Sequence, residues 1–178
     1  MYKRQISNDE GKLSIINTTI AENFGGGRSG GLALGEGEVE VVNSIVWGNR
    51  AEEGTREEQQ ILHASGTLLL SHSTVEGLDR LNAVSSYALD PLFVDPVRGD
   101  YRLSPHSPLI NQGTQVSIAM DLDLAGEARV FDDPAVVDDG VDLGAFETAL
   151  PPQASLSLIS QPRALACLLY TSDAADES

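Results

Sequence analysis

The densest group of side chains that could do chemistry lies between residues 121 and 147. Nine aspartates and glutamates share this stretch with one arginine. Ca²⁺ binds about six to eight oxygen ligands, and carboxylates supply them readily. Read as an EF-hand-like loop that starts at Asp121, the spacing fits at Asp123 and Gly126, and Asp132 stands where glutamate is usual. The stretch therefore predicts structural calcium held by Asp121, Asp123 and Asp132, with a solvated acidic surface as the alternative.

Two aromatic residues, Trp47 and Tyr101, are candidates for contact with sugar rings. Aromatic side chains carry broad apolar faces and, in these two residue types, a polar group at one end. Trp47 aligns with Ala21 and Glu76 in the repeat described below, and we expect it to point outward. The pair therefore predicts a polysaccharide or a cell-surface glycan as the partner.

Catalysis on a sugar polymer needs a base that removes a proton or a pair of carboxylates at a set separation. Lys12 is the only lysine after Lys3, and no Asp-x-Asp or Asp-Asp pair lies inside the repeated strands. The sequence therefore offers no candidate catalytic residue.

The elements that must position these side chains are set by a repeat. Residues 13–23 read LSIINTTIAEN, and residues 39–49, twenty-six positions later, read VEVVNSIVWGN; a third copy, around Leu68 and Leu70, follows after twenty-nine more. Apolar residues alternate within each copy, which indicates strands. A repeat of this period cannot bury its apolar face alone and stacks on its neighbour. The pattern predicts an all-β chain folded as a parallel β-helix.

Asparagines recur at two positions of this repeat. Asn17 corresponds to Asn43, and Asn23 corresponds to Asn49. In a parallel stack with a spacing of about 4.8 Å, each pair lies one above the other, so the amides can bond along the stack as a ladder. The alternative is the ordinary preference of asparagine for turns.

The C-terminal half carries a longer series of motifs: DPLFVDP at 90–96, GDYRLSPHSPLINQGT at 99–114, DLDLAGEAR at 121–129 and VDLGAFE at 141–147. In this order they resemble the C-terminal end of secreted bacterial right-handed parallel β-helix proteins, the pectin-lyase-like proteins, and in particular the group ending in a choice-of-anchor Q type domain. The resemblance covers residues 13–147 and departs at the enlarged acidic link, residues 131–140. It implies a right-handed parallel β-helix with a loop-rich C-terminal cap, export, and attachment to the cell surface.

Both ends of the chain resemble translated adapter DNA used in shotgun sequencing. Met1–Gln5 matches one strand of a transposase adapter, and the residues from Cys167 onward match its reverse complement and continuation. We therefore expect residues 1–5 and 167–178 to be non-native, and the only cysteine to play no role. The expected domains are β-helix coils at 6–88, a choice-of-anchor-like C-terminal end at 89–148 and a linker at 149–166.

The net charge of −16 argues against nucleic acid and anionic membranes as partners, and no apolar run reaches the length of a membrane span. We expect a non-catalytic part of a surface-anchored extracellular β-helix protein, which serves as an adhesin-like scaffold or binds carbohydrate. Two alternatives stay open: the C-terminal end of a polysaccharide lyase or glycoside hydrolase whose catalytic coils lie upstream, and a calcium-stabilised structural module. The sequence defines no oligomer.

Overall fold

The structure, a computed structural model, describes residues 5–116, 121–129 and 140–148. Its first part consists of three successive repeats, which we define as repeat 1 (residues 6–31), repeat 2 (32–60) and repeat 3 (61–77). Repeat 1 contains β1 (Ile6–Asn8), β2 (Lys12–Ile16), β3 (Thr19–Ala21) and β4 (Phe24–Gly25). Repeat 2 contains β5 (Leu32–Leu34), β6 (Glu38–Val42), β7 (Ile45–Trp47), β8 (Arg50–Ala51) and α1 (Arg56–Gln60). Repeat 3 contains β9 (Ile61–His63), β10 (Thr67–Ser71) and β11 (Thr74–Val75).

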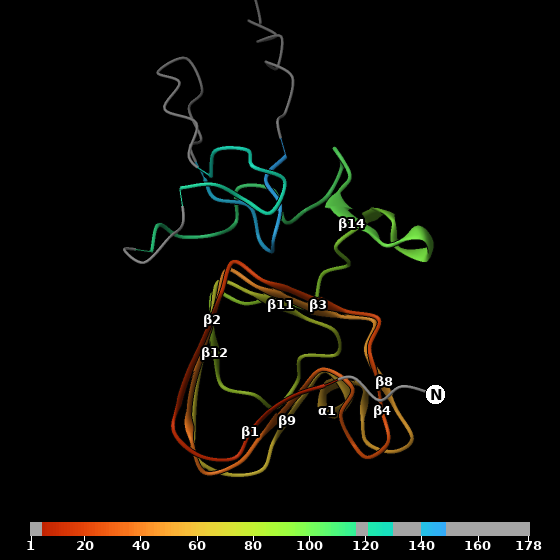
Figure 1. Cartoon of the computed structure of the whole chain (residues 1–178), viewed down its shortest axis with the longest axis vertical. Helices are drawn as coiled ribbons and strands as arrows, with labels where there is room; N and C mark the ends of the chain where they lie inside the picture. The colour runs from red at the N-terminus through yellow and green to blue at the C-terminus, as the bar shows by residue number, and fades with distance from the viewer. Residues whose placement is uncertain (1–4, 117–120, 130–139, 149–178) are drawn as a thin grey trace, which may run out of the picture.

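Each repeat contributes one strand to each of three parallel sheets, in the orders β1-β5-β9, β2-β6-β10-β12 and β3-β7-β11. Strand β12 (Ala83–Val84) follows the third repeat, and β4 pairs with β8 in a further parallel pair. Figure 1 shows the repeats lying one behind another, so that corresponding strands overlap. The all-β prediction is confirmed, since the described residues are mostly strands with one short α-helix.

The register between repeats follows the alternation of apolar residues. Val39 pairs with Leu13 on one side and with Leu68 on the other, and Val41 pairs with Ile15 and Leu70 in the same way. β-Branched and leucine side chains fit such a pleated, half-buried surface. The inward-facing residues form one core, in which Val39, Val41 and Leu70 are almost fully buried, while Leu13 and Leu68 pack at its margin.

The corner between the second and third sheets has the same backbone conformation in all three repeats, and the residue after β12 shares it. Asn17, Asn43, His72 and Ser85 have φ values of 48°, 50°, 43° and 47°. Asparagine tolerates this left-handed region better than most residues. The backbone conformation of the corner is therefore one reason why asparagine recurs there, independent of any hydrogen bond between repeats.

The short helix α1 is a local insertion in repeat 2. It explains why paired residues of repeats 2 and 3 are 29 positions apart, whereas those of repeats 1 and 2 are 26 apart. Thr55 caps it, accepting a hydrogen bond from the Glu58 N–H, while the Glu58 side chain accepts one from the Thr55 N–H. This capping box satisfies two amide groups that the first helical turn leaves free.

The C-terminal segment, which we define as the described residues from 90 to 148, lies against the outer face of the β3-β7-β11 sheet (Figure 1). It contains β13 (Phe93–Asp95), η1 (Pro96–Arg98) and β14 (Asp100–Leu103), with β13 antiparallel to β14. Ile45 of β7 packs here with Leu103, Leu109 and Leu143.

This position differs from the cap expected at the end of the stack. Beyond repeat 3, that end is occupied instead by β12, which pairs with β10, and by Tyr87, which bridges to Thr74. The C-terminal segment goes to the side because Ile45 and Trp47 present apolar surface outward there. The expected non-native ends, the 149–166 linker and most of the acidic link lie outside the described residues, apart from Gln5 and Gly140.

Candidate functional site

The structure brings the first predicted asparagine pair together. Asn43 Nδ2 donates to Asn17 Oδ1 at 3.0 Å, along the stacking direction. The same Nδ2 donates to the Thr114 carbonyl at 2.7 Å, and Asn43 Oδ1 accepts from the Thr114 N–H at 2.9 Å. Asn43 is fully buried. Its amide therefore joins two repeats and also holds the C-terminal segment, as a strand neighbour would.

A second series of polar contacts runs beside the asparagines, and sequence reasoning missed its role. In each contact a backbone N–H donates to the hydroxyl oxygen at the corresponding position one repeat further along. The Thr18 N–H donates to Ser44 at 3.2 Å, the Ser44 N–H to Ser73 at 3.0 Å and the Ser73 N–H to Ser86 at 3.3 Å. Each hydroxyl in turn donates to the carbonyl two residues before it. The recurrence of Ser or Thr directly after the corner residue was the available signal.

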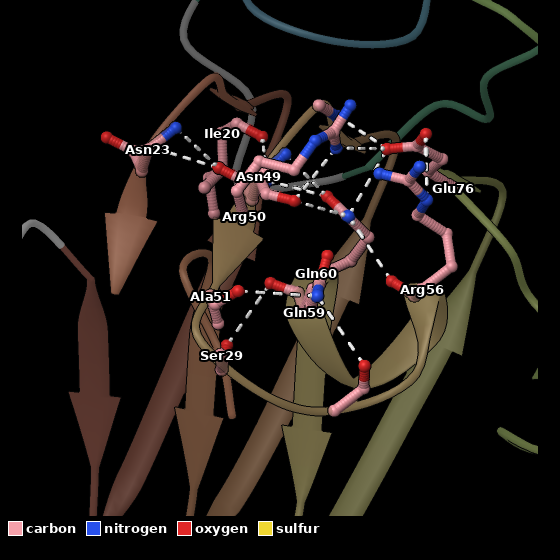
Figure 2. A network of polar contacts seen from close by, with 12 residues as sticks. Ile20, Asn23, Ser29, Asn49, Arg50, Ala51, Arg56, Gln59, Gln60 and Glu76 are labelled. Atoms are coloured by element: carbon pink, nitrogen blue, oxygen red, sulfur yellow. Dashed lines mark hydrogen bonds and ion pairs between the residues drawn. The ribbon is translucent and has the colours of Figure 1, made fainter. Parts of the chain in front are cut away.

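The second predicted pair is part of a buried network (Figure 2). Asn49 Oδ1 accepts from the Asn23 N–H and from Asn23 Nδ2, at 3.0 and 3.1 Å. Asn49 Nδ2 donates to the Ile20 carbonyl and to Gln60 Oε1, both at 2.9 Å. Asn49 and Gln60 are fully buried. Buried amides need this degree of pairing, because an unpaired one costs about 1–3 kcal/mol.

Glu76 closes this network at the surface. Its carboxylate accepts from the Gly48 N–H at 3.0 Å and forms ion pairs with Arg50 at 3.1 Å and Arg56 at 3.4 Å. Gln60 Nε2 donates to it at 3.3 Å (Figure 2). Arg50 and Arg56 therefore neutralise the charge of the Glu76 carboxylate.

Glu57, on α1, is a second buried carboxylate that serves the backbone. Its Oε1 accepts from the N–H groups of Asp79, Arg80 and Leu81, at 2.7, 2.9 and 3.1 Å. Glu57 as a whole is 6 % exposed. It fixes the turn that carries the chain from repeat 3 toward β12.

The predicted calcium ligands are used differently in the described residues. Asp123 is buried, and its Oδ1 accepts from the Ala125 and Glu127 N–H groups at 2.7 and 2.8 Å. Its Oδ2 accepts from the Glu147 N–H at 2.8 Å. Asp121 is exposed, and Asp132 lies outside the described residues. Both oxygens of Asp123 therefore hold the backbone of the C-terminal segment.

These contacts also set the charge state of Asp123. Burial alone would raise its pKa, but hydrogen bonds from the amides of Glu147, Glu127, Ala125 and Gly126 outweigh burial and hold the pKa below its usual value. Where the structure describes the chain, no three His, Cys, Asp or Glu side chains are grouped so that they could hold a metal ion.

A buried ion pair crosses the C-terminal segment. Arg129 and Glu147 are 2.9 Å apart, and their side chains are 5 % and 4 % exposed. Burial raises the pKa of Glu147 to about 7, with the neighbouring Asp142 charge adding to the rise and Arg129 opposing it. Burial also raises the pKa of Asp142, although its oxygens accept from the Asn111 and Thr148 amides at 2.8 Å.

A groove of about 540 Å³ lies between repeat 1 and the C-terminal segment. Its aromatic residues are Phe24, Tyr101 and Phe146, and its polar side chains include Glu22 and Asn23. The volume falls within the range of about 300–1,000 Å³ that is typical of ligand pockets. Of the two aromatic residues predicted to contact sugars, only Tyr101 lines this groove.

The surroundings of the two predicted aromatics explain the difference. The Tyr101 ring meets Phe93 edge-on, at a centroid distance of 5.3 Å and an interplanar angle of 82°. Burial, together with the charge of Glu22, raises the pKa of the Tyr101 phenol. Trp47 packs beside Ile45 under the C-terminal segment, in a cluster separate from the core of the repeats.

No helix among the residues described here combines the length and apolar character needed to cross a membrane. No protein-family model, curated protein or solved structure matches the chain.

Proposed function

We propose that this chain is a non-catalytic scaffold section of an extracellular, surface-anchored protein with a right-handed parallel β-helix fold. The observation that carries the proposal is the regular stacking of the three repeats. One strand of every repeat adds to each of three parallel sheets, in unbroken register. This stacking supports the proposed solenoid, an architecture that offers extended surfaces for binding.

The use of the buried polar groups supports a scaffold role. Asn43, Asn49, Glu57 and Asp123 direct their hydrogen bonds to neighbouring repeats or to backbone amides. Catalytic carboxylates instead face a substrate across a cleft. The proposal of export and surface anchoring rests on the order of the C-terminal motifs. The net charge of −16 favours solubility and argues against nucleic acid or an anionic membrane as the partner.

We further propose that the groove beside Tyr101 binds carbohydrate. The half-buried Tyr101 ring supplies apolar contact for the C–H groups of a sugar ring, and Glu22 and Asn23 supply acceptors and donors for its hydroxyls. The C-terminal segment forms one wall of the groove and repeat 1 forms the other. The site therefore depends on the packing of the C-terminal segment against the outer face of the β3-β7-β11 sheet.

The test is binding of the purified chain to a panel of neutral and acidic polysaccharides, measured by calorimetry. Tyr101→Phe should retain binding, and Tyr101→Ala should weaken it at least about fivefold, which corresponds to about 1 kcal/mol. Glu22→Gln tests the carboxylate in the same groove. Tyr87→Ala is the matched control, because Tyr87 lies outside the groove.

Equal binding by Tyr101→Ala and the parent chain would contradict the carbohydrate site. Release of unsaturated or reducing sugar ends from any polysaccharide would contradict the non-catalytic proposal and favour a lyase or a glycosidase instead.

A further inference from the structure

The four strands of repeat 1 all lie at the same end of their sheets. Within the described residues, β1, β2, β3 and β4 each pair with a strand of repeat 2 and with no other strand. Strands in this position leave N–H and C=O groups along one side that can pair with a further chain. We define the outer side of these four strands as the repeat-1 edge.

Three side chains at this edge make fewer hydrogen bonds, among the described residues, than their counterparts in repeat 2. Asn17 Oδ1 accepts from Asn43, while its Nδ2 has no partner among the described residues. Thr18 Oγ1 donates to the Ile16 carbonyl but accepts no N–H from the part of the chain that the structure describes, whereas Ser44 and Ser73 each accept one. Figure 2 shows Asn23 with its amide nitrogen toward Asn49 and its amide oxygen pointing away from the stack.

The free groups at this edge are the ones that would continue the hydrogen bonds between repeats 1 and 2 toward a further repeat. A segment placed on the edge in the same parallel register would offer an asparagine Oδ1 to Asn17 Nδ2. It would also offer a backbone N–H to Thr18 Oγ1. A second asparagine of the segment would donate its backbone N–H and its side-chain Nδ2 to Asn23 Oδ1, as Asn23 itself donates to Asn49 Oδ1.

We propose that the repeat-1 edge is a docking surface for one further repeat that carries the pattern Asn-Ser/Thr-x-Ile/Val-x-x-Asn and adds in parallel. The occupant is polypeptide of this stated chemistry, held by strand pairing and by the three side chains. The proposal goes beyond the scaffold function.

A second copy of the chain fits this surface less well. At the opposite end of the stack, β12 already pairs with β10, and Tyr87 already bridges to Thr74, so a head-to-tail copy has few free strands to offer. Two copies that meet at their repeat-1 edges run antiparallel, so the amide and hydroxyl groups lose their matching partners.

The test inserts a second copy of residues 6–31 between Gln5 and Ile6 of the full chain. This copy is 26 residues long, the same offset that separates repeat 1 from repeat 2. Two control chains carry a scrambled insert of equal composition, or the same insert with glycine at the positions copied from Asn17 and Asn23. Hydrogen exchange of the original β2 and β3 amides, and the thermal midpoint, are measured for all chains.

If the proposal holds, amide exchange in the original β2 and β3 slows by about tenfold or more relative to the scrambled insert, since these strands become interior. The thermal midpoint also rises, and the glycine insert gives a smaller effect on both. Unfolding of the inserted chain, or exchange equal to that of the scrambled control, would overturn the proposal. A parent chain whose β2 and β3 amides are already protected in a defined oligomer would overturn it in favour of a second copy.

Discussion

Replacing Asn43 by glycine separates the two possible reasons for asparagine at the corner of the repeat. Asn43 has φ 50°, a conformation that glycine adopts freely, so Asn43→Gly removes the side-chain contacts without backbone strain. Asn17→Gly is the matched control, because Asn17 has φ 48° at the corresponding corner.

The expected magnitudes follow from the contacts. The Asn43 amide makes three hydrogen bonds, one to Asn17 and two to Thr114. At about 0.5–1.5 kcal/mol net each, their loss destabilises the fold by about 1.5–4.5 kcal/mol. Asn17 accepts one of these bonds, so Asn17→Gly should cost only about 0.5–1.5 kcal/mol. Both changes loosen the unfolded chain equally, and that contribution cancels in the comparison.

The assay is urea unfolding followed by circular dichroism and by the fluorescence of Trp47, the single tryptophan. Trp47 packs where the C-terminal segment meets β7, so its emission also reports loss of the Thr114 contacts. Asn43→Gly should lower the free energy of unfolding by about 1–3 kcal/mol more than Asn17→Gly, given the two additional bonds. Equal values for the two variants, or a variant as stable as the parent, would show that asparagine serves only the turn.

Three further predictions concern other parts of the fold. The folded pKa of Glu147, about 7, lies above its ordinary value of 4.5, so the folded chain binds a proton that the unfolded chain releases between these values. The free energy of unfolding should therefore fall as pH rises from about 4.5 to about 7, and a titration of Glu147→Gln should show a shallower fall; parallel curves would contradict the assignment. Gly144→Ala should loosen the C-terminal segment, because φ is 97° and the new Cβ would lie 2.6 Å from Thr19 Oγ1 and 2.8 Å from Ile45 Cδ1. Gly126→Ala, with φ 88° but nothing within 4 Å, isolates the backbone strain, and equal protease sensitivity of the two variants would refute the packing argument. Glu57→Ala should destabilise by about 1.5–3 kcal/mol or more by removing a charged acceptor from three backbone amides, whereas Glu57→Gln should retain part of this in chemical denaturation; equal losses would argue against the acceptor role.

The pairing of the strands was accessible from the sequence because its signal is local and repeated. Alternation fixes which residues face inward, and a shift of one residue would reverse every side chain. The offsets between copies therefore determined that Val39 pairs with Leu13 and with Leu68.

The position of the C-terminal segment was not accessible in the same way. Nothing in its own motifs distinguishes the end of the stack from the outer face of β3-β7-β11. The choice depends on Asn43 and Ile45, which lie about seventy residues earlier in the sequence and reach Thr114 and Leu109 only in the folded chain. Long-range packing of this kind leaves no local periodicity.

The role of the acidic residues was hidden for a different reason. A carboxylate that binds a cation and a carboxylate that accepts backbone amides look alike in sequence. Asp123 accepts from three N–H groups of its own segment, and Glu57 accepts from three N–H groups beyond repeat 3. Only the path of the backbone around each side chain reveals which partner it has.

The central claim is that each strand pairs in parallel with the corresponding strand of the next repeat. Cysteine cross-linking tests it most directly. Ser14 pairs with Glu40, and Glu40 pairs with Leu69, at outward-facing positions of β2, β6 and β10. In a chain with Cys167→Ser, the double variants Ser14→Cys/Glu40→Cys and Glu40→Cys/Leu69→Cys should form a disulfide within the folded monomer, because adjacent strands lie about 4.8 Å apart. Ser14→Cys/Leu69→Cys should not form one, since two strand spacings, about 9.6 Å, exceed the reach of a disulfide. Cross-linking of Ser14 to Leu69, or failure of both adjacent pairs, would contradict the stacked order.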